Sequence, residues 1–98
     1  MKDYVASFEL IPLEDNELFG ACSGVAVCGF VHTTDIKEAL NLFEKDLKEM
    51  SFRIMEVEYI SLYGEMQWDK KTQKEYDDYM TEAERSSKII YSKFWAYK

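Results

Sequence analysis

The stretch FGACSGVAVCGFVHTTD, residues 19–35, decides how the rest of the chain is arranged. Successive side chains of a strand point to opposite faces, so residues 20–32 can be sorted by parity. The small residues fall together on one face: Gly20, Cys22, Gly24, Ala26 and Cys28. The valines fall on the other face: Val25, Val27 and Val31. Apolar groups on both sides predict an interior strand over residues 21–32, and the small face lets another element approach its backbone closely.

Regular elements are expected on both sides of this strand. Residues 3–11 alternate between apolar and polar side chains, which predicts a first strand with one face toward water, ended by Pro12. Residues 36–50 place apolar side chains at helical spacing. Asp35 and Glu38 stand where a capping box would start that helix.

The second half of the chain predicts three more elements. Residues 51–64 alternate as a third strand, and the alternation slips near Tyr59, which indicates a bulge. A second helix is expected from Asp69 to about Arg85. Residues 88–98 are rich in β-branched and aromatic side chains and predict one last strand.

The order strand, strand, helix, strand, helix, strand predicts a single α+β domain over residues 1–98. We expect a two-layer sandwich, in which a four-stranded sheet carries both helices on one face. The arrangement resembles a ferredoxin-like domain in its general topology, with an acidic turn in place of the helix after the first strand. This resemblance rests on topology alone and implies no function.

The formal net charge is −7, and the first 50 residues hold ten of the 19 acidic side chains but four of the 12 basic ones. This charge disfavours binding to nucleic acid and to anionic membranes. No segment has the length of apolar sequence that a membrane span needs, and no signal peptide is evident. We therefore expect a cytoplasmic protein with reduced thiols.

The glycines, the two cysteines and the single histidine do not predict a cofactor or a metal site. No phosphate-binding or dinucleotide-binding pattern surrounds the glycines. In an extended strand Cys22 and Cys28 would lie roughly 20 Å apart, too far for a disulfide or a shared metal ion with His32.

Two weaker candidates for chemistry remain. His32, with Thr33 and Thr34, stands at the carboxyl end of the second strand, where a small ligand can bind in a crossover unit. A histidine at the solvent edge, bonded to nearby hydroxyls, is the simpler interpretation. Glu56 and Glu58 share the spacing of paired catalytic acids, but nothing else indicates a sugar cleft, so we expect no enzyme.

The sequence favours a small acidic protein-interaction module, of the inhibitor or immunity type, that binds a basic surface of a partner protein. The acidic turn is the expected contact, with two carboxylates of the second helix next: Glu14, Asp15, Glu17, Asp77 and Asp78. Trp95 and Tyr97 are candidate anchors, although packing of Phe94 or Trp95 in the core is the simpler interpretation.

Self-association is also expected. If both helices cover one sheet face, the apolar second strand needs another cover on its other side, such as a second subunit. The protein would then be a homodimer through the sheet face. The alternative function is a dimeric ferredoxin-like domain that holds a small regulatory ligand at His32, Thr33 and Thr34.

Overall fold

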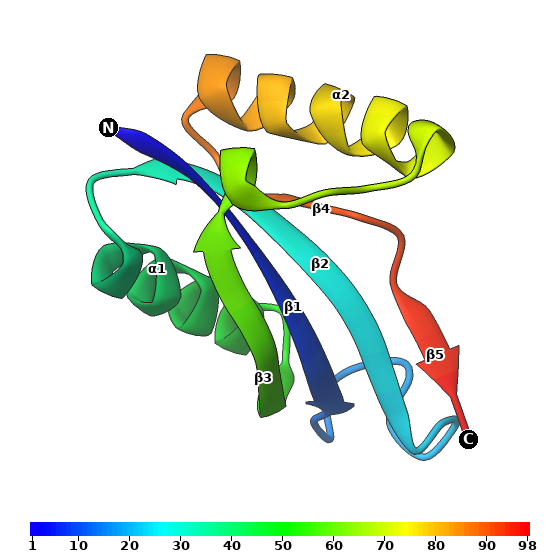
Figure 1. The fold of residues 1–98 in the computed structure, drawn as a ribbon. Helices are drawn as coiled ribbons and strands as arrows, with labels where there is room; N and C mark the ends of the chain where they lie inside the picture. The colour runs from blue at the N-terminus through cyan, green and yellow to red at the C-terminus, as the bar shows by residue number, and fades with distance from the viewer.

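The computed structural model describes residues 1–98 and has one antiparallel sheet with two helices (Figure 1). The strands are β1 (Lys2–Pro12), β2 (Gly24–Thr33), β3 (Phe52–Leu62), β4 (Ile90–Tyr91) and β5 (Trp95–Tyr97). The helices are α1 (Ile36–Glu49), the short 3₁₀ helix η1 (Tyr63–Glu65) and α2 (Lys70–Ser86). The α+β class and the predicted element order are confirmed.

The two central strands of the sheet are β1 and β2. The strand order is β3-β1-β2-β4, and β5 also pairs with β2 beyond the end of β4. Both β2 and β3 run antiparallel to β1, so they are parallel to each other. Helix α1 connects them, with β1 inserted between. This split crossover is the ferredoxin-like part of the topology.

The prediction that the residues before the first helix form an interior strand is confirmed from Gly24 onward. β2 pairs with β1 from Val25 to Thr33 and with β4 and β5 on its other side. Residues 19–23 belong to the preceding turn instead, where Gly20 has a positive φ of 80°. Glycine adopts this backbone conformation without steric penalty.

Local capping explains where both long helices begin. The Asp35 carboxylate accepts the backbone N–H of Glu38 at 2.8 Å, and the Asp69 carboxylate accepts that of Thr72 at 2.8 Å. Each bond satisfies a donor that the first helical turn leaves free. The backbone and hydroxyl groups of Thr72 also hold the pKa of Asp69 below its ordinary value. Neither helix has the length and apolarity that crossing a membrane requires.

The expectation that both helices cover one sheet face is wrong. Helix α1 packs through Phe43 and Leu47 on the face that carries Phe8 and the valines of β2. Helix α2 packs through Met80 and Ala83 on the opposite face. There it meets Val5, Phe30 and Cys28, together with aromatic side chains that include Tyr59, Tyr63, Trp68, Tyr76 and Tyr79.

The physical reason is that β1 and β2 each bury an apolar side chain on the face that α1 does not cover, where the sequence shows mainly polar residues in β1 and small residues in β2. Val5 and Phe30 are both 0% exposed, and Phe30 lies in a tilted or edge-to-face contact with three tyrosine rings. Those two residues give α2 a surface on which to pack. The sheet is therefore sandwiched between α1 and α2 (Figure 1). Because α2 packs on this face of β2, a second subunit is not required to cover it.

The predicted last strand is two short strands, β4 and β5, separated by residues 92–94. Both lie beside β2, and glycines allow aromatic side chains to approach that strand from both faces. A Cβ at Gly24 would lie 2.5 Å from the Tyr97 hydroxyl, and one at Gly29 would lie 2.5 Å from the Phe43 ring. The predicted close approach to the backbone is thus confirmed, with Tyr97 on the small-residue face.

Edge strand β3 contains two irregularities in its pairing with β1. The register shifts between the pairs formed by Ser7 and Phe8, and again between those formed by Glu9 and Leu10. The first shift leaves Glu58 without a partner opposite it and confirms the predicted bulge near Tyr59. Bulges increase the local twist and interrupt the regular edge that a second strand would need for pairing.

Candidate functional site

One part of the sheet surface carries no helix. Helix α2 lies across the end of the sheet near the N-terminus, and the other end of that face is open (Figure 1). The side chains there form what we call the open sheet face: Ser7, Glu9, Ala26, Glu56, Glu58, Trp95 and Tyr97. They come from four strands, β1, β2, β3 and β5.

Strand pairing determines which of these side chains are neighbours. Glu9 lies directly opposite Glu56, and Ala26 lies opposite Trp95. The Ser7 hydroxyl donates to the Glu58 carboxylate at 2.8 Å, which keeps that bulge residue on the same face. Three glutamates and an indole are therefore presented together.

The glutamates of the open sheet face are electrostatically unbalanced. The one ion pair in the chain joins His32 to Asp3, so no lysine or arginine nitrogen lies within 4.0 Å of Glu9, Glu56 or Glu58. Like charges directly opposite each other on two strands are destabilising. Partial desolvation of the Tyr97 hydroxyl raises its pKa, and the nearby carboxylates of Glu9 and Glu58 raise that pKa further. The face has an excess of negative charge, and none of its three glutamates forms an ion pair within the chain.

Trp95 is the most exposed large aromatic side chain, at 73%. The interpretation of Trp95 as a core residue is therefore wrong. Phe94 is not a core residue either, because it is 36% exposed, although its ring stacks on Phe52 at 5.6 Å and lies 5.6 Å from Tyr91. Trp95 points to the opposite side of β5, onto Ala26, whose small side chain gives it no wall to pack against. The sequence-predicted residues Trp95 and Tyr97 do lie together on an accessible surface.

The predicted acidic turn is a separate surface. Glu14, Asp15 and Glu17 are exposed in the turn after β1, at the end of the molecule away from α2 (Figure 1). Asp15 and Glu17 border a hollow of about 600 Å³. Its other walls include Glu49, Met50 and Phe94.

The predicted carboxylates of α2 do not join the turn. Asp77 accepts hydrogen bonds from the Tyr63 hydroxyl at 2.6 Å and from the Gln73 amide at 2.7 Å. Asp77 thus ties α2 to η1, and Asp78 is exposed on the same helix. Burial of Tyr63 and its bond to Asp77 raise the pKa of Tyr63 above its ordinary value of 10.0. The structure therefore assigns Asp77 a local contact within the fold.

The two cysteines and the histidine have different surroundings. Cys22 lies in the turn, where its thiol is 3.8 Å from the Leu18 carbonyl oxygen. The Cys28 sulfur faces α2, 3.6 Å from the Tyr76 hydroxyl and 3.9 Å from that of Tyr59. Both thiols are free. Burial and the neighbouring Cys28 raise the pKa values of both tyrosines above 10.0.

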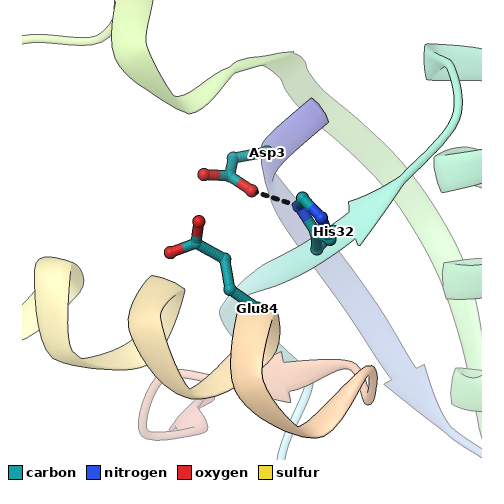
Figure 2. A group of neighbouring side chains, drawn as sticks. All are labelled: Asp3, His32 and Glu84. Carbon is teal, nitrogen blue, oxygen red and sulfur yellow. Dashed lines mark hydrogen bonds and ion pairs between the residues drawn. The ribbon is translucent and has the colours of Figure 1, made fainter. Parts of the chain in front are cut away.

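His32 belongs to a small polar cluster that the sequence did not reveal (Figure 2). Its Nδ1 lies 2.6 Å from a carboxylate oxygen of Asp3, the residue opposite it on β1. Glu84 reaches toward both from α2. Thr33 is buried and next in the strand, and Thr34 is exposed, so the three residues expected to share a ligand do not converge. Asp3 and Glu84 lie near opposite ends of the sequence, and no local pattern connects them.

Comparisons with models of protein families, with curated proteins and with solved structures found no match for this chain. The surfaces described above are therefore the basis for inferring function. Of these, the open sheet face combines exposed aromatic area with uncompensated charge.

Proposed function

We propose that this protein is an acidic interaction module that binds a basic segment of a partner protein on its open sheet face. The observation that carries the proposal is the trio Glu9, Glu56 and Glu58, none of which forms an ion pair within the chain, beside the exposed ring of Trp95. Binding of a lysine or arginine side chain would supply the missing positive charge.

The arrangement of Glu9 and Glu56 supports a cationic ligand. A cross-strand pair of like charges disfavours folding, and each exchange to a neutral residue would remove the repulsion. A ligand cation between the two carboxylates reverses the sign of that interaction and forms charge-assisted hydrogen bonds. The repulsion present in the free protein therefore becomes attraction in the complex.

Trp95 supplies the apolar part of such a contact. The side chain of lysine or arginine has an apolar stem and a charged head, and the stem can lie on an aromatic ring while the head reaches a carboxylate. A cation within about 6 Å of an indole also gains about 0.5–1 kcal/mol at an exposed site. Because Tyr97 lies on the same face, the partner segment would meet two aromatic side chains along β5.

The negative charge of the open sheet face argues for a different protein as the occupant rather than a second copy of this chain. In a symmetric contact between two such faces, the glutamates of both copies would approach each other and repel. A basic partner has complementary charge. Within this proposal the turn carboxylates Glu14, Asp15 and Glu17 serve mainly to attract the partner over longer range.

Within this proposal, the protein acts in the cytoplasm as an inhibitor or immunity-type protein. A protein that covers the basic surface of an enzyme or of a nucleic-acid-binding protein prevents that surface from binding its substrate or nucleic acid. Such inhibition requires no catalytic activity in the inhibitor. The two free thiols are compatible with a reducing compartment.

The test compares two triple variants that remove the same charge at two places. Glu9→Gln, Glu56→Gln and Glu58→Gln neutralise the open sheet face, and Glu14→Gln, Asp15→Asn and Glu17→Gln neutralise the turn. Each is titrated with a lysine- and arginine-rich peptide of about ten residues, and with an acidic peptide of equal length, by isothermal titration calorimetry at two salt concentrations.

We expect the sheet variant to lose at least about tenfold in affinity for the basic peptide, equivalent to about 1.4 kcal/mol. The turn variant should lose about twofold to threefold, with most of that loss disappearing at high salt because distant charges are screened. Equal losses in both variants, or equal binding of the acidic peptide, would show that the open sheet face is not the binding surface.

A further inference from the structure

The cluster of Asp3, His32 and Glu84 lies outside the open sheet face, at the end of the sheet that α2 covers (Figure 2). Three elements contribute one side chain each: Asp3 from β1, His32 from β2 and Glu84 from α2. One ligand atom of each residue lies within 4.8 Å of the other two. We propose that this cluster binds a divalent transition-metal ion of the Zn²⁺ type.

The spacing of the three ligand atoms fits a single ion. Metal bonds from zinc to imidazole nitrogen and carboxylate oxygen are about 2.0–2.2 Å, so two ligand atoms in tetrahedral positions on one ion lie about 3.3–3.6 Å apart. Ligand atoms that lie up to 4.8 Å apart would need to close by at most about 1.5 Å, while the 2.6 Å contact between His32 Nδ1 and Asp3 would open by about 1 Å or less. Glu84 is exposed on α2 and its side chain is free to make that movement.

The charges around the cluster also favour a cation. Two carboxylates from distant parts of the chain face one imidazole, whose Nδ1 lies 2.6 Å from an oxygen of Asp3. No lysine or arginine nitrogen lies within 4.0 Å of Glu84. The adjoining hollow is bordered by a further carboxylate, Glu65, as well as by Lys2. A divalent ion would convert the repulsion between Asp3 and Glu84 into two attractive bonds.

The donor set selects the class of metal. Carboxylates alone suit Mg²⁺ and Ca²⁺, whereas an imidazole together with carboxylates suits Zn²⁺ and its neighbours among the transition metals. The side chains of His32 and Asp3 are 27% and 30% exposed, so the site is shallow and open to water. Three protein ligands would leave at least one coordination position for water or for a group of another molecule.

A bound ion would connect α2 to the two central strands. Glu84 lies in the last turns of α2, while Asp3 and His32 are paired residues of β1 and β2. Binding to the folded state alone raises stability with metal concentration. The structure therefore predicts a metal-dependent unfolding midpoint.

The experiment uses the full chain, freed of metal with EDTA and exchanged into clean buffer. ZnCl₂ is titrated by calorimetry, and the unfolding midpoint is followed with Zn²⁺ and, separately, with Mg²⁺. We expect one Zn²⁺ per chain and a midpoint raised by at least about 4 °C at saturation, with little change in Mg²⁺.

Variants separate this site from other groups that bind zinc. His32→Asn and Glu84→Gln should each weaken Zn²⁺ binding at least tenfold, while Glu82→Gln, which removes the same charge from the same helix, should bind as the natural protein does. A Cys22→Ser, Cys28→Ser variant should also keep its affinity. Absence of stoichiometric Zn²⁺ binding would overturn the proposal, as would binding that survives Glu84→Gln but is lost with the cysteines.

Discussion

Replacement of Gly29 by alanine tests how closely α1 packs on the sheet. The added Cβ would lie 2.5, 3.1 and 3.2 Å from three atoms of the Phe43 ring, where ordinary carbon contacts are about 3.5–4.0 Å. The ring must therefore move by about 1 Å. Phe43 is 0% exposed and is held by an edge-to-face contact with Phe8 at 5.1 Å and by Tyr91 at 6.4 Å, so it has little room.

The expected loss follows from two opposing effects. Overpacking of a core costs about 1–3 kcal/mol. Alanine restricts the unfolded chain more than glycine does, which returns about 0.4–1 kcal/mol. The centres of these two ranges leave a net loss of about 1.3 kcal/mol for Gly29→Ala, and the unfolding midpoint should fall by about 5–10 °C.

The assay is urea unfolding followed by circular dichroism, with two other glycines as controls. A Cβ at Gly64 would meet no atom within 4 Å, so Gly64→Ala should leave stability unchanged or slightly raised. At Gly24 the nearest atom is the hydroxyl of Tyr97, at the far end of a side chain that can swing aside, so the loss should be smaller than at Gly29. If Gly29→Ala is as stable as Gly64→Ala, the packing of Phe43 against β2 is refuted.

Three further predictions concern titration, capping and binding. Burial, and then its 2.8 Å hydrogen bond to Asp46, raise the pKa of Tyr91 above its ordinary value of 10.0, so the unfolded chain ionises first. The free energy of unfolding should therefore stay constant below about pH 9 and decrease above pH 10. For this one group the decrease is up to about 1.4 kcal/mol per pH unit. In urea titrations, Tyr91→Phe should make this decrease with pH smaller. Asp35→Ala removes the acceptor of the Glu38 backbone N–H and should lower the free energy of unfolding by about 1 kcal/mol, measured in urea. Trp95→Ala should change that free energy by less than about 0.5 kcal/mol but weaken binding of the basic peptide severalfold in calorimetry; a large loss of stability would show that the indole belongs to the core.

Most elements of the fold could be predicted because their signals are local. The helical spacing after Asp35, the cap that Asp35 provides and the small residues of β2 all act within one or two turns of chain. The bulge near Tyr59 was visible as a slip in alternation. Such features depend on neighbouring residues and are encoded over short stretches of sequence.

The placement of α2 could not be predicted from local pattern. It depends on Val5 and Phe30, one buried residue on each of two strands, which meet only after β1 and β2 pair. Each is a large apolar residue on a strand face that otherwise carries polar or small side chains. Taken alone, neither residue indicates that a helix packs on that face. The pair Val5 and Phe30 is joined directly in the register, and that long-range contact decides which face the second helix covers.

In the candidate sites, too, local features could be predicted from the sequence and contacts between distant residues could not. Trp95 and Tyr97 could be singled out because tryptophan and tyrosine are residue types that often anchor interfaces. The grouping of Glu9 with Glu56 required the register of β1 and β3, and the grouping of Asp3 with Glu84 required the position of α2. Residues far apart in the chain come together through packing, which the alternation of single strands does not encode.

The most direct test of the proposed function is chemical-shift mapping of the ¹⁵N-labelled protein during titration with the basic peptide. We predict that the amide signals which move most belong to the strands around Glu9, Glu56, Glu58 and Trp95, together with the indole N–H of Trp95. Changes confined to residues 14–17 or to α2, or no change at a peptide concentration that saturates the calorimetric signal, would contradict it.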